Sequence, residues 1–198
     1  MKVIILSGFL GAGKTSVLLQ MAHYLTDTST DRMPVTVAIL ENEIGKVSVD
    51  GSTLRAQGIE VRDLFAGCVC CTLTGELASA VREIEAEVMP DWLIVEATGL
   101  AFPDRTADLI REYATNLEVL KIIVLVDAEH FLILDRMVPL ISGQPCFADI
   151  LLLNKVDLVE DAIRQKTVDR LREINSEAQL FEIVAIEQLP DTLWQEVL

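Results

Sequence analysis

The sequence has 198 residues, of which 31 are acidic and 16 are basic, so its formal net charge is −15 at pH 7. Apolar residues make up 51% of the chain, which excludes an intrinsically disordered protein and is enough for the core of one ordinary domain. The acidic balance argues against a surface for nucleic acid or for an anionic membrane, because both partners are polyanions.

The apolar runs are short, and they predict no membrane span. Runs such as 122–126 and 150–153 fall far below the roughly 18 residues that a spanning helix needs. Met1 and Lys2 lead directly into four apolar residues and then Ser7, which is unlike a secretory signal. We therefore expect a cytoplasmic protein with a single domain over residues 1–198 and no further C-terminal domain.

Apolar blocks of strand length alternate with helical patterns along the chain. In chain order, the pattern predicts strand 3–6, helix 14–25, strand 35–40, a loop over 42–58, strand 59–64, helix 77–88, strand 92–95, helix 106–114, strand 120–126, helix 128–137, strand 150–153, helix 162–174, strand 180–184 and a short helix up to residue 198. Continuous apolar strands separated by helices are typical of a parallel sheet covered on both faces. The expected class is α/β, with three layers and a mostly parallel central sheet flanked by helices.

A phosphate-binding loop is the strongest motif. Residues 8–15 read G-F-L-G-A-G-K-T, which matches G-x-x-x-x-G-K-[ST] where a predicted strand passes into a predicted helix. Glycines let the backbone approach phosphate oxygens, and the helix N-terminus offers N–H donors. The motif predicts a P-loop NTPase in which Lys14 contacts the β- and γ-phosphates and the Thr15 hydroxyl binds Mg²⁺. The predicted phosphate-binding residues are Gly8, Gly11, Ala12, Gly13, Lys14, Thr15 and Ser16.

A second motif predicts which base is bound. Residues 151–157 read L-L-L-N-K-V-D and end a predicted buried strand. The Asp157 carboxylate can accept both the guanine N1–H and the exocyclic amine, a donor pair that adenine lacks. Asn154 is predicted to hold the purine edge or the neighbouring loops, and the Lys155 stem to lie across the base. The pattern favours GTP over ATP; the alternative is a helix start with Asp157 as its N-cap.

A carboxylate and a glycine follow the strand predicted at 92–95. Residues 92–99 read W-L-I-V-E-A-T-G, so Glu96 can hold a Mg²⁺-bound water or the ion, and the Gly99 amide can approach the γ-phosphate. Leu100 follows Gly99, so the water-positioning glutamine of Ras-type switches is absent there. Asp127, which ends the next strand, is a further candidate or a simple strand terminus. The predicted catalytic residues are Lys14, Thr15 and Glu96.

Three of the four cysteines lie together in residues 67–72, which read G-C-V-C-C-T. Thiolates suit Zn²⁺, Cu(I) or Ni²⁺, and three ligands on one loop leave a fourth position open. Glu41 or Glu43 could complete the shell, whereas His23 and His130 are weaker candidates. A redox pair and inert buried thiols are the alternatives. The predicted metal ligands, for Mg²⁺ and the transition metal together, are Thr15, Glu41, Cys68, Cys70, Cys71 and Glu96.

The motifs together resemble the CobW-like GTPases, which are metallochaperone relatives of the hydrogenase- and urease-maturation GTPases. The shared motifs are G-F-L-G-A-G-K-T, E-N-E-I-G, G-C-V-C-C-T, E-A-T-G-L and N-K-V-D, in that order. The resemblance implies a P-loop fold, Mg·GTP hydrolysis, and zinc or a similar ion at Cys68, Cys70 and Cys71. It also implies a switch loop over 41–50. Many relatives continue into a second domain.

These observations lead to a hypothesis and two rivals. We expect a GTP-driven metallochaperone that delivers its metal, or assists cofactor insertion, to a client metalloenzyme, with a homodimer left open as a further association. The main rival is a nonmetal regulatory GTPase that gates corrinoid or other cofactor loading of a partner enzyme. A small-molecule kinase is the weakest reading, because Asn154 and Asp157 specify guanine.

Overall fold

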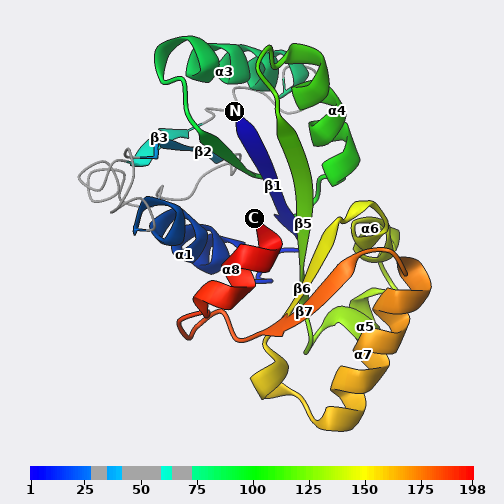
Figure 1. The fold of residues 1–198 in the computed structure, drawn as a ribbon. Helices are drawn as coiled ribbons and strands as arrows, with labels where there is room; N and C mark the ends of the chain where they lie inside the picture. The colour runs from blue at the N-terminus through cyan, green and yellow to red at the C-terminus, as the bar shows by residue number, and fades with distance from the viewer. Residues whose placement is uncertain (28–34, 42–58, 64–72) are drawn as a thin grey trace.

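Seven parallel strands form one sheet in the computed structural model, which describes residues 1–27, 35–41, 59–63 and 73–198 (Figure 1). The strands are β1 (Lys2–Gly8), β2 (Val37–Glu41), β3 (Ile59–Asp63), β4 (Trp92–Glu96), β5 (Val119–Asp127), β6 (Ile150–Asn154) and β7 (Gln179–Ile183). Their order across the sheet is β3-β2-β4-β1-β5-β6-β7, and each neighbouring pair runs parallel. The predicted strands are confirmed to within two residues at each end. The sheet, predicted to be mostly parallel, is parallel throughout its described strands.

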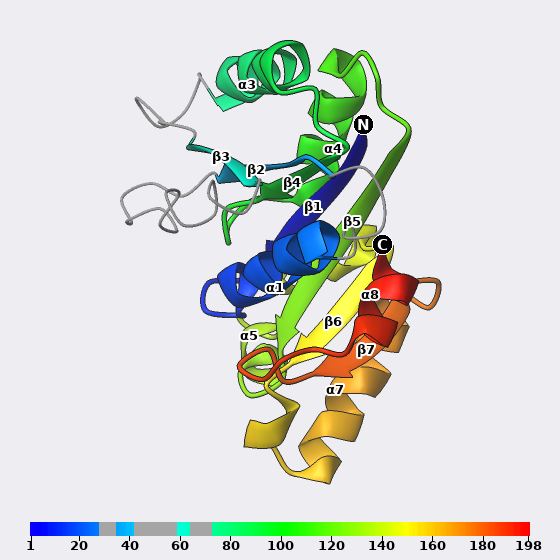
Figure 2. The same cartoon turned by 60° about the vertical axis from the view of Figure 1, so that its left-hand side comes forward.

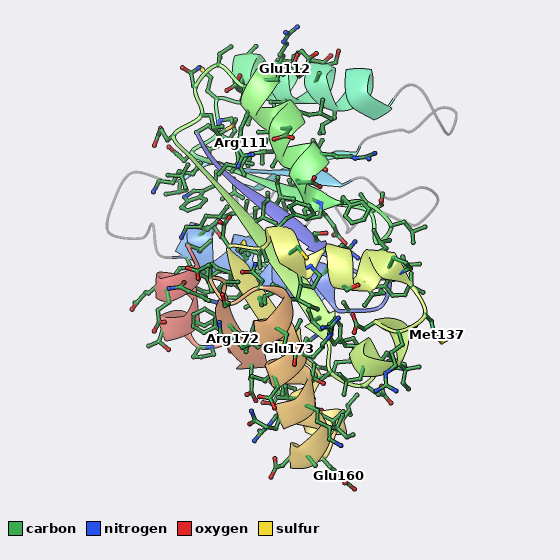
Figure 3. All side chains as sticks on the ribbon, turned by 90° about the vertical axis from the view of Figure 1, so that its right-hand side faces the viewer. Arg111, Glu112, Met137, Glu160, Arg172 and Glu173 are labelled. Atoms are coloured by element: carbon green, nitrogen blue, oxygen red, sulfur yellow. The ribbon has the colours of Figure 1, made fainter. Side chains whose placement is uncertain are left out.

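Helices cover both faces of the sheet, which confirms the three-layer α/β prediction. The helices are α1 (Lys14–Asp27), α3 (Leu73–Glu87), α4 (Pro103–Tyr113), α5 (Phe131–Leu134), α6 (Pro139–Gly143), α7 (Asp161–Ile174) and α8 (Asp191–Val197), with 3₁₀ turns η2 (Pro145–Phe147) and η3 (Val156–Leu158). Helices α1 and α8 lie side by side on one face (Figure 2). The other helices contribute their buried side chains to the opposite face, seen in Figure 3.

The central strand β1 shows why the apolar runs are continuous. Ile4 and Leu6 pack with α1 and α8 on one face, while Val3 and Ile5 pack into the core on the other. Because successive side chains of a strand point to opposite faces, a strand covered on both sides must be apolar at every position. The continuous runs in the sequence are therefore a direct consequence of the two helical layers.

The helix predicted over 128–137 is wrong in length. Only α5 is α-helical there, and it ends at Leu134. Val138 is extended (φ −131°, ψ 103°), as expected for a residue whose α conformation would clash with the following Pro139. Met137, labelled in Figure 3, is 72% exposed at the turn that results. The chain then forms α6 and η2, neither of which the hydrophobic pattern predicts.

The parallel arrangement gathers the polar strand ends at one edge. Gly8, Glu96, Asp127 and Asn154 each end a strand, and the carboxyl ends of parallel strands share one edge of a sheet. The loop predicted over 42–58 lies outside the described residues. Within the ranges described, no helix has both the length and the apolar character to cross a membrane.

Candidate functional site

The phosphate loop joins β1 to α1 in a tight turn. The Ala12 N–H donates to the Phe9 carbonyl at 3.1 Å, and the Val17 N–H donates to the Gly13 carbonyl at 3.2 Å at the start of the helix. Gly13 has φ +100°, and a Cβ at this position would collide with the side-chain amide of Asn154. The glycine before the lysine is therefore required both by the backbone conformation and by the packing of the N-K-V-D segment against the loop.

Lys14 occupies the interior of this loop. Its ammonium donates to the Gly8 carbonyl at 3.1 Å and lies 3.5 Å from the Phe9 carbonyl, and its side chain is buried. A buried ammonium needs hydrogen-bond acceptors, and these two carbonyls provide them. A phosphate group entering the loop would offer charged oxygens to the same ammonium, so Lys14 is placed to exchange backbone carbonyls for phosphate.

Thr15 and Glu96 form the pair of oxygen ligands that the sequence predicts for Mg²⁺. The Thr15 hydroxyl donates to Glu96 Oε1 at 3.5 Å, joining the first turn of α1 to the end of β4. Glu96 is only 7% exposed, and Thr15 is exposed. A hydroxyl and a buried carboxylate beside a phosphate loop are the hard oxygen donors that Mg²⁺ prefers, so these residues fit the ion.

The sheet register extends this acidic edge toward the predicted transition-metal ligands. Glu41 pairs with Glu96 across β2 and β4, and Glu41 pairs with Asp63 across β2 and β3. Three acidic residues therefore end three neighbouring strands. For Glu41 and Asp63 the structure describes the backbone alone. Of the other predicted or weighed ligands, Glu43, Cys68, Cys70 and Cys71 lie outside the described residues.

Gly99 lies against the phosphate loop. A Cβ on Gly99 would lie 2.8 Å from the backbone nitrogen of Leu10. The segment is held from behind by Gln144, whose buried amide donates to the Gly99 carbonyl at 3.3 Å and to the Ala101 carbonyl at 2.8 Å. Gln144 thus fixes the chain after β4. Its role is not evident from the sequence, because Gln144 lies between α6 and η2, two short elements that hydrophobic periodicity does not predict.

Asn154 connects three parts of the site. Its Nδ2 donates to the Ala12 carbonyl of the phosphate loop at 2.8 Å, and its Oδ1 accepts the Ala185 N–H at 2.8 Å. The side chain is 3% exposed, so both bonds are shielded from water. Of the two roles weighed for Asn154, holding the neighbouring loops is the one that the structure shows.

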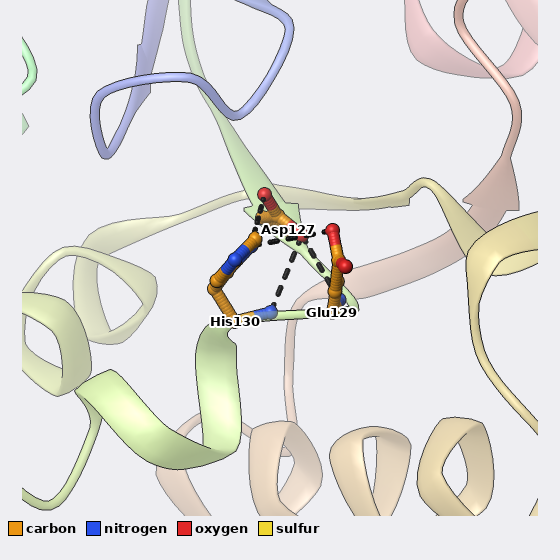
Figure 4. Close-up of side chains that lie close together, drawn as sticks. All are labelled: Asp127, Glu129 and His130. Carbon is orange, nitrogen blue, oxygen red and sulfur yellow. Dashed lines mark hydrogen bonds and ion pairs between the residues drawn. The ribbon is translucent and has the colours of Figure 1, made fainter.

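Lys155 and Asp127 form an ion pair beside the phosphate loop. Lys155 follows β6 in the left-handed conformation (φ +64°), and its Nζ lies 2.7 Å from Asp127 Oδ2. Asp127 also accepts the Glu129 N–H at 2.9 Å and contacts His130 Nδ1 at 3.1 Å (Figure 4). Burial raises the pKa of Asp127, but the hydrogen bonds from Lys155, His130 and Glu129 outweigh it, so the pKa of Asp127 lies below its ordinary value of 3.8.

The same three residues, Asp127, Glu129 and His130, bring two carboxylates and an imidazole within 4.8 Å of one another. The ammonium of Lys155 already contacts Asp127 Oδ2, which is where a cation would bind. The arrangement therefore supports Asp127 as an anchor for Lys155 more directly than as a metal ligand. Asp157, which follows Lys155 by two residues, is exposed at the same edge of the sheet.

A cavity of about 270 Å³ lies beside the phosphate loop. Phe9 and Leu10 line it from the loop, and Phe131 and Ile141 line it from α5 and α6. Asp127 and Lys155 also reach it. The outer side of the phosphate loop is therefore incompletely packed, in keeping with the 53% exposure of Leu10.

This geometry agrees with a comparison of the sequence with known families, in which residues 2–182 match the family described as "CobW/HypB/UreG, nucleotide-binding domain". The chain belongs to the CobW/HypB/UreG family.

Relatives in the CobW/HypB/UreG family include proteins named for zinc. The zinc chaperone YjiA of Escherichia coli (strain K12) is 32% identical in an alignment of 193 positions, which covers 91% of this chain and 57% of YjiA. The zinc-regulated GTPase metalloprotein activator 1 of Dictyostelium discoideum is 28% identical in an alignment of 222 positions, which covers 90% of this chain and 44% of that protein. The chain thus spans about half the length of these relatives.

A solved structure in the same family has the same fold. It is a zinc-bound triple mutant of the YjiA GTPase in which one glutamate and two cysteines are replaced by alanine. The two chains superpose with a TM-score of 0.67 at 27% identity, covering 92% of this chain and 57% of the other.

All of the residues predicted to bind the nucleotide lie in the described ranges, and the fold brings them to one edge of the sheet. Gly8, Gly11, Ala12, Gly13, Lys14, Thr15 and Ser16 form the phosphate loop and first helical turn, with Glu96 and Gly99 on one side and Asn154, Lys155 and Asp157 on the other. The sequence motifs do not reveal two further side chains that hold the site: Gln144, described above, and Gln20 of α1, whose Nε2 donates to the Ala185 carbonyl at 2.9 Å. A single glutamine in a sequence does not indicate which distant backbone groups it contacts.

Proposed function

We propose that this chain binds and hydrolyses GTP, and that the nucleotide controls its binding of zinc or a similar transition metal for delivery to a client metalloenzyme. The observation that carries the proposal is the continuous row Glu96, Glu41 and Asp63 along the sheet edge. One end of the row contacts Thr15 of the phosphate loop. At the other end of the row, Asp63 directly precedes in sequence the segment 64–72, which contains the three clustered cysteines.

The nucleotide half of the proposal assigns a task to each residue of the edge. Lys14 gives up the Gly8 carbonyl and pairs with phosphate oxygens, while the N-terminus of α1 supplies N–H donors. Thr15 and Glu96 are the residues that would hold Mg²⁺, which supplies neutralising charge to the phosphates when it is bound. Lys155 and Asp157 are assigned to the base.

Turnover without a partner should be slow. Leu100 follows Gly99 where a water-positioning glutamine would otherwise stand, and its side chain is exposed and apolar. A leucine cannot orient a water molecule by hydrogen bonding. The client, or another protein that contacts this edge, is the expected source of any stimulation.

The metal half of the proposal places the transition metal between Glu41 and the cysteines. Cys68 follows the end of β3 at Asp63 by five residues in the sequence. In the YjiA structure, the replaced glutamate and adjacent cysteines have the same spacing along the chain as Glu41, Cys70 and Cys71 here. That YjiA variant was still zinc-bound, so an assay must separate tight binding from weak surface binding.

Competition with a chromophoric chelator makes this separation. We expect the wild-type chain to hold one zinc ion against the chelator and a Glu41→Ala/Cys70→Ser/Cys71→Ser variant to lose it. Cys146→Ser is the matched control, because Cys146 is exposed on η2 and its thiol contacts only the Ser142 carbonyl among the described residues. Zinc held equally tightly by the triple variant would refute the metal half.

The same titration distinguishes the rival function. A regulatory switch that gates cofactor loading without carrying metal would still bind GTP, but it would show no tight zinc site in any nucleotide state. If the wild-type chain binds GTP but holds no zinc against the chelator in any nucleotide state, the result favours that rival.

A further inference from the structure

The loop that follows β7 lies next to the N-K-V-D segment. The Ala185 N–H is bonded to Asn154 Oδ1, and Ala185 is buried. Leu189, near the end of the loop, is also buried, whereas Ile186 between them is 91% exposed. The loop is therefore anchored at two points and presents its middle to solvent at the edge where Asp157 lies.

Gln20 of α1 holds this loop with three hydrogen bonds. Its Nε2 donates to the Ala185 carbonyl at 2.9 Å and to the Glu187 carbonyl at 3.0 Å, and its Oε1 accepts the Leu189 N–H at 2.8 Å. The amide thus uses both of its N–H donors and its carbonyl on one short loop. The three bonds link residues that are 165 or more positions apart in the chain, so they are tertiary contacts and not local helix contacts.

Only a carboxamide of this length can make all three contacts. A carboxylate keeps the acceptor for Leu189 but cannot donate to two carbonyls, and an apolar side chain makes none of the bonds. Gln20 lies six residues after Lys14 on α1, beyond the first turn that carries Lys14 and Thr15. Its contacts therefore concern the base side of the site and leave the contacts of Lys14 and Thr15 untouched.

We propose that Gln20 is a positioning residue for guanine selection. It fixes Ala185, Ala185 fixes Asn154 through Oδ1, and Asn154 sets the position of the segment that ends in Asp157. This inference rests on the proposed assignment of that segment to the base. When Gln20 is replaced, the loop samples other conformations, and the apparent affinity falls by the fraction of chains that remain competent.

The test compares guanine with adenine nucleotides in matched titrations. Fluorescent GDP and ADP analogues are titrated into the wild-type chain, Gln20→Met and Gln20→Glu with Mg²⁺ present. We expect the GDP affinity of both variants to fall about tenfold and the ADP affinity to stay within about twofold, because ADP is held through its phosphates. In steady-state GTP hydrolysis, KM should rise while kcat stays nearly unchanged.

Gln165→Met is the matched control, since Gln165 is exposed on α7 and its side chain bonds only Asp169 of the same helix among the residues that the structure describes. Gln20→Glu keeps the shape of the side chain and the bond from Leu189, so it carries the test if Gln20→Met does not fold. An unchanged ratio of GDP to ADP affinity in a folded Gln20 variant would overturn the role of Gln20 alone. A wild-type chain that binds both nucleotides equally would overturn guanine selection itself, and the role of Gln20 with it.

Discussion

Replacement of Asn154 by alanine tests the connection on which the site depends. The change removes the donor to the Ala12 carbonyl and the acceptor for the Ala185 N–H, both at 2.8 Å and both shielded from water. Leaving a buried backbone group without a partner costs about 1–3 kcal/mol. The variant leaves two such groups, and water that enters the space left by the side chain reduces their cost. We therefore expect the free energy of unfolding to fall by about 2–4 kcal/mol.

The assay is urea unfolding without nucleotide, followed by titration with a fluorescent GDP analogue. Asn116→Ala is the control, because its side chain is exposed and donates only to Thr115 in the described structure. We expect the control to change stability by less than about 0.5 kcal/mol. The reasoning would be refuted if Asn154→Ala were as stable as the control and bound GDP with wild-type affinity.

Three further substitutions probe separate parts of the site. Asp127→Asn should lower the free energy of unfolding by about 1–2 kcal/mol at neutral pH. Because the folded pKa of Asp127 is below 3.8, the contribution of its charge is fully present above about pH 4 and disappears as the pH falls through the folded pKa, so unfolding curves of wild type and variant should converge in acid. Gln144→Met should cost about 1–3 kcal/mol in urea unfolding, since it frees the carbonyls of Gly99 and Ala101 from their donor. Glu96→Gln should lower the rate of phosphate release from GTP roughly ten- to hundredfold while leaving GDP affinity within a few-fold, and equal rates would remove Glu96 from the catalytic set.

The sheet was predictable because burial on two faces leaves a clear trace in sequence. Val3, Ile4, Ile5 and Leu6 are apolar at consecutive positions, and this pattern has few explanations besides a covered parallel strand. The region 128–147 was not predictable in the same way. Its helices are four and five residues long, and their ends are set by Pro139 and by local turns that hydrophobic periodicity does not report.

In the candidate site, too, some residues were predictable from the sequence and others were not. Lys14 and Asn154 lie in motifs whose spacing reflects a local geometry, so their places at the sheet edge followed from the sequence. Gln20 and Gln144 act through backbone groups of distant segments, Gln20 on the loop after β7 and Gln144 on the chain after β4. Those partnerships depend on tertiary packing, and one sequence does not reveal them. Asp127 lies between these two cases. The sequence identifies it as a polar strand end, but its ion pair with Lys155 is evident only from the fold.

The most direct test of the account is the zinc affinity of the wild-type chain in two nucleotide states. Chelator competition is carried out with GDP and with a non-hydrolysable GTP analogue, each at a saturating concentration with Mg²⁺. The account predicts that zinc affinity differs at least about fivefold between the two states, which corresponds to a coupling free energy of about 1 kcal/mol. Equal zinc affinity in both states would contradict the proposed coupling through Glu96 and Glu41.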